Sequence, residues 1–181
     1  MRTKFVALLA IPLAAFVLAC GATGSSTSAG GGGGDVKQQG ASEKKAPATV
    51  KAGEVMTLTE SILGQTTVVE ITLTNVKPNA KSGNQFSKPG KGQFVTADVS
   101  VLVKQGKYTI NSSSFKFIGA DSTAYDSTIG LDGKDLSAND LAAGQKTSGT
   151  VWFDVAKGAE AGGKIALKSY LADGDAGYWT L

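Results

Sequence analysis

Residues 93–104 read Gln-Phe-Val-Thr-Ala-Asp-Val-Ser-Val-Leu-Val-Lys and carry the clearest structural pattern in the chain. Small apolar side chains occupy every second position: Val95, Ala97, Val99, Val101 and Val103. Successive side chains of a β-strand point to opposite faces, so this period of two places all of them on one face. A helix would scatter them around its circumference, and β-branched residues disfavour helices. The pattern therefore predicts a half-buried β-strand.

Further short strands are predicted on both sides of this one. They cover residues 55–59, 67–74, 108–110, 114–118, 147–155, 164–170 and 177–181. Residues 77–84 should form a loop, and the polar stretch 132–145 has room for one helical turn. About seven or eight short strands with almost no helical pattern predict an all-β fold, an antiparallel immunoglobulin-like β-sandwich. A small closed barrel is the alternative topology.

The first twenty residues have the pattern of an export signal. Arg2 and Lys4 precede an uncharged apolar run over residues 5–19, as in secretory signal peptides. The run is shorter than the roughly 20 residues of a membrane-spanning helix. Its end, Val17-Leu18-Ala19-Cys20, resembles the lipobox of bacterial lipoproteins. That resemblance implies cleavage before Cys20, lipidation of its thiol and anchoring in the membrane by acyl chains such as palmitate. We therefore expect residues 1–19 to be a lipoprotein signal peptide.

Residues 20–52 lack hydrophobic periodicity and include an unbroken glycine run at 30–34. Such a stretch buries too little apolar surface to offset the entropy of ordering it. We therefore expect a flexible linker after the lipidated cysteine, and thirty such residues span about 30 Å. The sandwich domain should occupy residues 53–181.

Composition restricts the chemistry open to the protein. Its 181 residues contain no histidine, and Cys20 is the only cysteine. Metal sites built from His and Cys and nucleophile systems that need histidine are therefore excluded. The formal charge of +3 falls to +1 when Arg2 and Lys4 leave with the signal peptide. Such a charge gives no clustered basic face for nucleic acid, and we expect neither a nucleic-acid partner nor a cofactor.

Four stretches together resemble a known domain family: residues 92–101, residues 113–117 with Asp121 and Tyr125, residues 141–155, and residues 178–181. They are similar to the telokin-like, immunoglobulin-like domain of Gram-positive and especially actinobacterial lipoproteins. That family includes a secreted mycobacterial immunoprotective antigen. The resemblance covers about Gly53 to Leu181, and it implies an extracellular sandwich without a settled role.

Three residues on the two strongest strands are candidates for a site. Asp98 and Asp154 should point outward, and they could form a carboxylate pair of the kind found in glycosidases if their strands were neighbours. Solvated positions on the sheet face are the simpler interpretation. Trp152 should also point outward, either as an exposed partner contact together with Asp154 and Asp98 or beneath a covering loop or strand.

Two acidic loops are weaker candidates for calcium. They contain Asp132 and Asp135, and Asp173 and Asp175. Neither has the spacing of an EF-hand loop, and Asp-Gly pairs are common in tight turns.

These observations predict a non-catalytic binding module, anchored through Cys20 to the extracytoplasmic face of the cell membrane. Its partner would be an envelope protein or ligand that the sequence does not identify. The alternatives are a solute- or metal-binding lipoprotein associated with transport and a carboxylate-based cell-wall hydrolase.

Overall fold

The computed structural model describes residues 46–83, 87–130, 132–169 and 173–181. The predicted signal peptide, Cys20 and the linker up to residue 45 lie outside them. The described elements are β1 (Ala48–Lys51), β2 (Val55–Ile62), β3 (Gln65–Ala80), β4 (Gln93–Gln105), β5 (Lys107–Asn111), the 3₁₀ turn η1 (Ser112–Ser114), β6 (Phe115–Ile118), β7 (Ala124–Thr128), β8 (Ser137–Ala142), β9 (Lys146–Val155), β10 (Lys164–Lys168) and β11 (Asp175–Thr180). Within these ranges no helix is long and apolar enough to cross a membrane.

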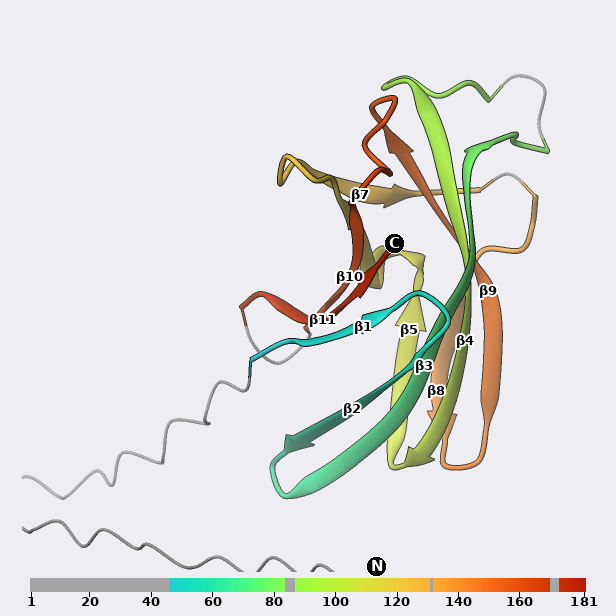
Figure 1. Ribbon diagram of the computed structural model, residues 1–181. Coiled ribbons are helices and arrows are strands. Elements are labelled where there is room, and N and C mark those ends of the chain that lie inside the picture. The colour runs from blue at the N-terminus through green and yellow to red at the C-terminus, as the bar shows by residue number, and fades with distance from the viewer. Residues whose placement is uncertain (1–45, 84–86, 131, 170–172) are drawn as a thin grey trace, which may run out of the picture. The chain divides into compact units, whose positions relative to one another are not determined.

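Two layers of strands enclose the core (Figure 1). One layer has the order β1-β11-β10-β6-β7, and the other has the order β9-β4-β3-β2. The short strand β7 joins the layers, because it pairs with β6 and, at Ser127 and Thr128, also with β9. β5 and β8 form a separate two-stranded sheet. The ladder ends at β1 on one side and β2 on the other, so the fold is the predicted sandwich and not a closed barrel.

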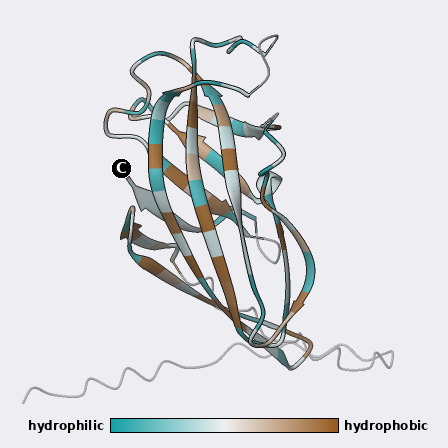
Figure 2. Ribbon diagram, turned by 90° about the vertical axis from the view of Figure 1, so that its right-hand side faces the viewer, coloured by the Kyte–Doolittle hydropathy of each residue, from teal (hydrophilic) through white to brown (hydrophobic). Residues whose placement is uncertain are grey.

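The inner face of β4 forms the centre of the core. Its alternate residues Val95, Ala97, Val99, Val101 and Val103 are all at most 2% exposed. Alternating hydrophobic and hydrophilic segments are visible along the long strands (Figure 2). From across the sandwich, Phe117 packs on Phe153 with ring centroids 5.9 Å apart, and Trp179 is fully buried. Burial of this apolar surface is the main favourable term that holds the two layers together.

A second, smaller core lies on the outer face of the same sheet. Phe94 and Trp152 meet edge to face there, with ring centroids 5.8 Å apart. The backbone of Gly130 covers the indole, because a Cβ at this glycine would lie 2.1 Å from Trp152 Nε1. One half of β4 is consequently buried on both faces, which the simple alternation in the sequence does not predict.

The structure differs from the sequence expectations in four segments. Residues Ala124–Thr128, for which no strand was expected, form β7. Residues 48–51, expected in the linker, form β1 in parallel register with β11. β3 continues to Ala80, into the first half of the expected loop, and register shifts after Thr74 and Lys77 accommodate Pro78. The segment with room for a helical turn instead contains β8, which pairs with β5. The described residues therefore form eleven strands, more than the seven or eight expected.

Close packing against Gly149 leads to a prediction about stability. The loop before β8 docks on β9, where Leu136 N donates to Thr150 O at 3.2 Å. A Cβ at Gly149 would lie 2.5 Å from Leu136 Cα, a backbone atom that cannot move alone. Gly149→Ala should therefore lower the free energy of unfolding by about 1–3 kcal/mol, as overpacking does. Denaturant unfolding measures the change.

The control is Ser148→Ala, since Ser148 is the exposed neighbour on the same strand. It should change the free energy of unfolding by less than about 0.5 kcal/mol. Equal stabilities for the two variants would contradict the packing of Leu136 on β9.

Candidate functional site

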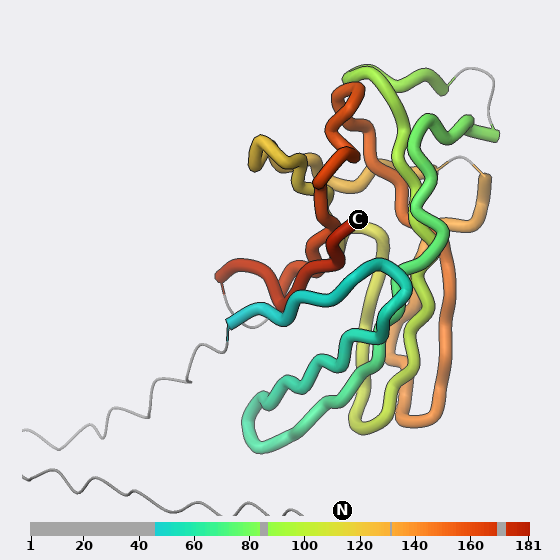
Figure 3. Tube along the Cα trace, viewed as in Figure 1, coloured from blue at the N-terminus to red at the C-terminus, as the bar shows by residue number. Residues whose placement is uncertain are grey.

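A groove of about 800 Å³ opens at the end of the sandwich where the β2–β3 hairpin turn meets two turns that connect the sheets. The turns between β2 and β3, β4 and β5, and β8 and β9 lie at the lower end of the chain trace (Figure 3). We call this recess the hairpin groove, and it is lined by Glu60, Ile62, Gln65, Thr66, Thr67, Gly106, Lys107, Tyr108, Thr109, Ala142 and Ala143. Its volume lies within the range of small-ligand and peptide sites in proteins.

The β2–β3 hairpin and the β5–β8 sheet form opposite walls of the groove. They meet at its base, where Thr67 Oγ1 donates a hydrogen bond of 3.3 Å to the carbonyl of Lys107. Gly106 permits this approach, because its φ is +76° and a Cβ there would lie 2.7 Å from Thr67 Oγ1. The walls are therefore fixed at the base and open toward solvent.

The tip of the β2–β3 hairpin exposes apolar side chains beside the groove. Leu63 is fully exposed and Ile62 is 51% exposed. Leu63 and Gly64 have φ values of +49° and +80°, as a type I′ turn requires at its two central positions. Asn, Asp or Gly is favoured at the first of these positions, because a larger side chain is strained there. Neither turn geometry nor burial explains a leucine at this position.

Glu60 is the one carboxylate in the groove wall. Partial burial raises the pKa of the Glu60 carboxyl above its ordinary value. An ion pair or hydrogen bond would normally offset the cost of burying a carboxylate. None joins Glu60 to another residue of the described ranges. The groove thus carries one partly buried carboxylate without an ion-pair or hydrogen-bond partner among the described residues.

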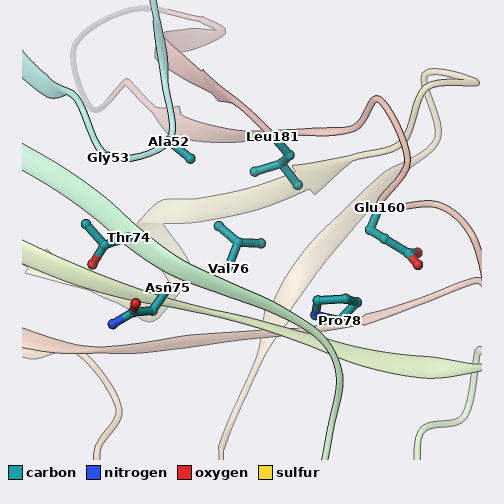
Figure 4. A pocket seen from close by; sticks show the side chains of 8 residues that line it. All are labelled: Ala52, Gly53, Thr74, Asn75, Val76, Pro78, Glu160 and Leu181. Atoms are coloured by element: carbon teal, nitrogen blue, oxygen red, sulfur yellow. The ribbon is translucent and has the colours of Figure 1, made fainter.

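A second recess, of about 380 Å³, lies beside the C-terminus (Figure 4). Val76, Pro78, Glu160 and Leu181 surround its opening. The polar groups of this recess already have partners. Glu160 accepts a hydrogen bond from Gln93 Nε2, and Asn75 Nδ2 donates to Asp98 Oδ2 at 2.9 Å. It is smaller than the hairpin groove and offers fewer free polar groups, so the hairpin groove is the stronger candidate.

Asp98 and Asp154 lie on neighbouring strands, as the carboxylate pair requires, but too far apart along them. Asp98 is opposite Thr150, and Asp154 is opposite Phe94. The two carboxylates are therefore offset by four residues, or about 13 Å at the rise of a β-strand. Glycosidase pairs are about 5–9.5 Å apart. The structure does not bring these side chains together as a catalytic pair.

Each of the two carboxylates instead has a structural partner. Asp154 accepts hydrogen bonds from the backbone N–H groups of Gly90 and Lys91 at 2.7 and 3.0 Å. Asp98 accepts hydrogen bonds from Asn75 Nδ2 and, at 3.2 Å, from Thr150 Oγ1. Asp154 therefore holds the loop before β4, and Asp98 ties β3 to β9.

Trp152 does not present an exposed contact surface. It is 5% exposed and lies against Phe94 and Gly130. The backbone of Gly130 lies against the indole, so this side chain is not presented to solvent in the described structure.

The acidic loop residues have ordinary structural partners. Asp132 accepts the N–H of Lys134, and Asp135 accepts that of Gly130. Asp175 forms a 2.8 Å ion pair with Lys116 and accepts the hydroxyl of Tyr178. Asp173 is exposed in the loop before β11. In the described ranges no group of three or more His, Cys, Asp or Glu residues is placed to hold a metal ion.

The sequence analysis missed the residues of the hairpin groove. One signal was present, since Ile62 and Leu63 stand directly before Gly64 in a tight turn, where polar residues are usual. The groove itself depends on three turns that are far apart in the chain, and periodicity within single strands does not indicate which turns meet.

Comparison with known proteins agrees with this fold. The model of a family described as a domain of unknown function, DUF4352, matches residues 62–175. No curated protein matches the chain significantly.

Three solved structures share the architecture. The secreted protein MPT63 of Mycobacterium tuberculosis is 24% identical, with a TM-score of 0.61 over 75% of this chain and 98% of its own. The yjhA protein of Bacillus subtilis is 15% identical, with a TM-score of 0.52 over 68% and 84%. The putative lipoprotein ycdA of Bacillus subtilis is 14% identical, with a TM-score of 0.51 over 73% and 38%. The expected similarity to a secreted mycobacterial protein is thus confirmed at the level of the fold.

The role of Asp154 can be tested by Asp154→Asn. An amide offers one acceptor oxygen where the carboxylate offers two, so one of the Gly90 and Lys91 N–H groups loses its partner. We expect faster amide hydrogen exchange at these two residues and a loss of about 1 kcal/mol in the free energy of unfolding.

The matched control is Asp98→Asn, which removes the other candidate carboxylate from the adjacent strand. Exchange at Gly90 and Lys91 should not change in this variant. If both variants accelerated exchange at Gly90 and Lys91 equally, the two carboxylates would act as a coupled unit. That would contradict the strand register, which places them four residues apart.

Proposed function

The chain belongs to the DUF4352 domain family, and on that premise we propose that it is a non-catalytic binding module on the extracytoplasmic face of the cell membrane. A lipid on Cys20 would hold it there, and residues 21–45 would act as the tether. The hairpin groove would receive the partner.

The exposure of Leu63 beside the hairpin groove carries this proposal. A fully exposed leucine in a left-handed backbone conformation contributes nothing to the sandwich. It stands next to a recess of about 800 Å³ whose wall contains the half-exposed Ile62. Apolar side chains around a concave site, with a small number of polar groups, are typical of binding sites.

The available chemistry favours binding over catalysis. The chain has no histidine, and its one cysteine lies in the lipobox. The two strand carboxylates hold structural hydrogen bonds and are offset by about 13 Å along their strands. The hairpin groove contains hydroxyl groups, one carboxylate and one lysine, without a base placed beside a nucleophile.

Two kinds of observation support the location. The charged start, the apolar run and Val17-Leu18-Ala19-Cys20 have the order of a lipoprotein signal. Among the proteins of similar fold, one is described as secreted and another as a putative lipoprotein.

Crosslinking in living cells tests the proposal. A photo-reactive residue at position 63 should give a discrete crosslinked product, whereas the same residue at the exposed position Lys157, outside the groove, should not. The variant Cys20→Ala should move the protein out of the membrane fraction, because the thiol that accepts the lipid is absent.

Diffuse background from both positions would refute binding at the hairpin end. Retention of Cys20→Ala in the membrane fraction, extracted only by detergent, would refute the lipid anchor on this cysteine. The two readouts are independent, so the location and the binding role can fail separately.

A further inference from the structure

One wall of the hairpin groove ends in a free strand edge. β2 is the last strand of its layer and pairs only with β3 among the described strands. It has eight residues, an edge of about 26 Å. Long edge strands in natural proteins are usually protected by charged side chains, Pro, a bulge or a covering segment. The one charged residue of β2 is Glu60. β2 contains no Lys or Pro, and its register with β3 runs without a shift.

The hairpin register fixes which backbone groups of β2 point away from β3. Ile62 and Gln65 close a two-residue turn, so they form a hydrogen-bonded pair. Hydrogen-bonded pairs alternate along an antiparallel ladder, so Glu60, Leu58 and Met56 also bond to β3. The N–H and C=O groups of the intervening residues point to the free edge, and these residues are Val55, Thr57, Thr59 and Ser61.

Side chains on the inward face of β2 lead into the groove. Met56 is buried in the core, and Glu60 and Ile62 line the groove on the same face. A strand added to the edge of β2 would point every second side chain in this direction. It would close the open side of the groove between β2 and the β5–β8 sheet.

Charge indicates what one of those side chains should be. Glu60 is the only charged residue in β2, and no cation of the described residues pairs with it. Lys107, in the opposite wall, is exposed to solvent and forms no ion pair with Glu60. Oppositely charged side chains on adjacent strands stabilise a sheet when they lie directly across from each other. An incoming basic side chain would therefore compensate the half-buried carboxylate.

We propose that the hairpin groove binds an extended peptide segment, which adds to the free edge of β2 as a strand. Apolar side chains of the peptide enter the groove at alternate positions, and a Lys or Arg among them lies opposite Glu60. The inference rests on the proposed binding function and names the class of partner. Strand addition explains the free strand edge, the groove beside it and the half-buried carboxylate without an ion-pair partner together.

Selection from a displayed peptide library tests strand addition. The probe is a library of octapeptides, matched to the length of β2. Val, Ile, Leu, Lys, Arg or Glu occupies alternate positions, and Thr or Ser occupies the others. The bait is the full-length chain purified in detergent. Selected peptides should carry Lys or Arg at one inward position, and Glu60→Lys should reverse that preference to Glu.

Thr59→Pro separates backbone pairing from side-chain contact. Thr59 is exposed and its N–H points to the free edge, so a proline there leaves the β3 ladder intact and removes one donor. Affinity for a selected peptide should fall about tenfold or more, the effect of losing one hydrogen bond. The control Thr59→Val retains the N–H and should bind within about twofold of the unchanged protein.

N-methylation of alternate peptide bonds in the selected peptide provides the same test without changing the protein. Methylation at residues whose N–H faces β2 should abolish binding, and methylation at the other set should have little effect. If Thr59→Pro does not fold, this measurement alone decides whether the peptide pairs with β2 through its backbone.

Two results would overturn the inference. If selected peptides bound Thr59→Pro and both N-methylated forms unchanged, the groove would recognise side chains only, and the proposed binding function would stand. The second result would be that the unchanged protein selects no peptide more strongly than the Thr59→Pro variant does, although a photo-reactive residue at position 63 still forms a crosslink in cells. The partner would then belong to another class, such as an anionic lipid surface.

Discussion

Burial of the inward side chains of β4 is the constraint on which the other strands depend. The small residues from Val95 to Val103 leave a flat apolar face that must be covered along its whole length. β3 and β9 flank β4 in the same layer, and the layer of β6, β10 and β11 covers the face from across the sandwich. Phe117, Phe153 and Trp179 fill the space that the small side chains of β4 leave.

The two ends of this sheet differ in how they are covered, and this difference determines where the candidate site lies. Near its start, β4 is buried on both faces, because Phe94 and Trp152 form a second core beneath Gly130. Near the hairpin turns, the β2–β3 hairpin and the β5–β8 sheet diverge from their contact at Thr67 and Lys107. The first end is closed by packing, whereas the second retains a groove, a free strand edge and exposed Ile62 and Leu63.

Local alternation predicted the strands that have one continuous apolar face, such as β4 and β9. It missed β1, β7 and β8, which are short and mostly polar. They exist because they pair with β11, with β6 and β9, and with β5. Trp152 shows the same limit, since alternation placed it on the outer face and only the tertiary position of Gly130 explains its burial. Cys20 could be proposed from the sequence because it ends a short linear pattern that resembles a lipobox. The hairpin groove joins residues from β2 to β8 and needs the folded chain.

Amide hydrogen exchange in the free, full-length protein tests most directly whether the edge of β2 is open. The account predicts alternation: slow exchange for Met56, Leu58, Glu60 and Ile62, whose N–H groups bond to β3, and fast exchange for Val55, Thr57, Thr59 and Ser61. Equal protection of both sets without any added peptide would contradict it, because the edge would then already be covered.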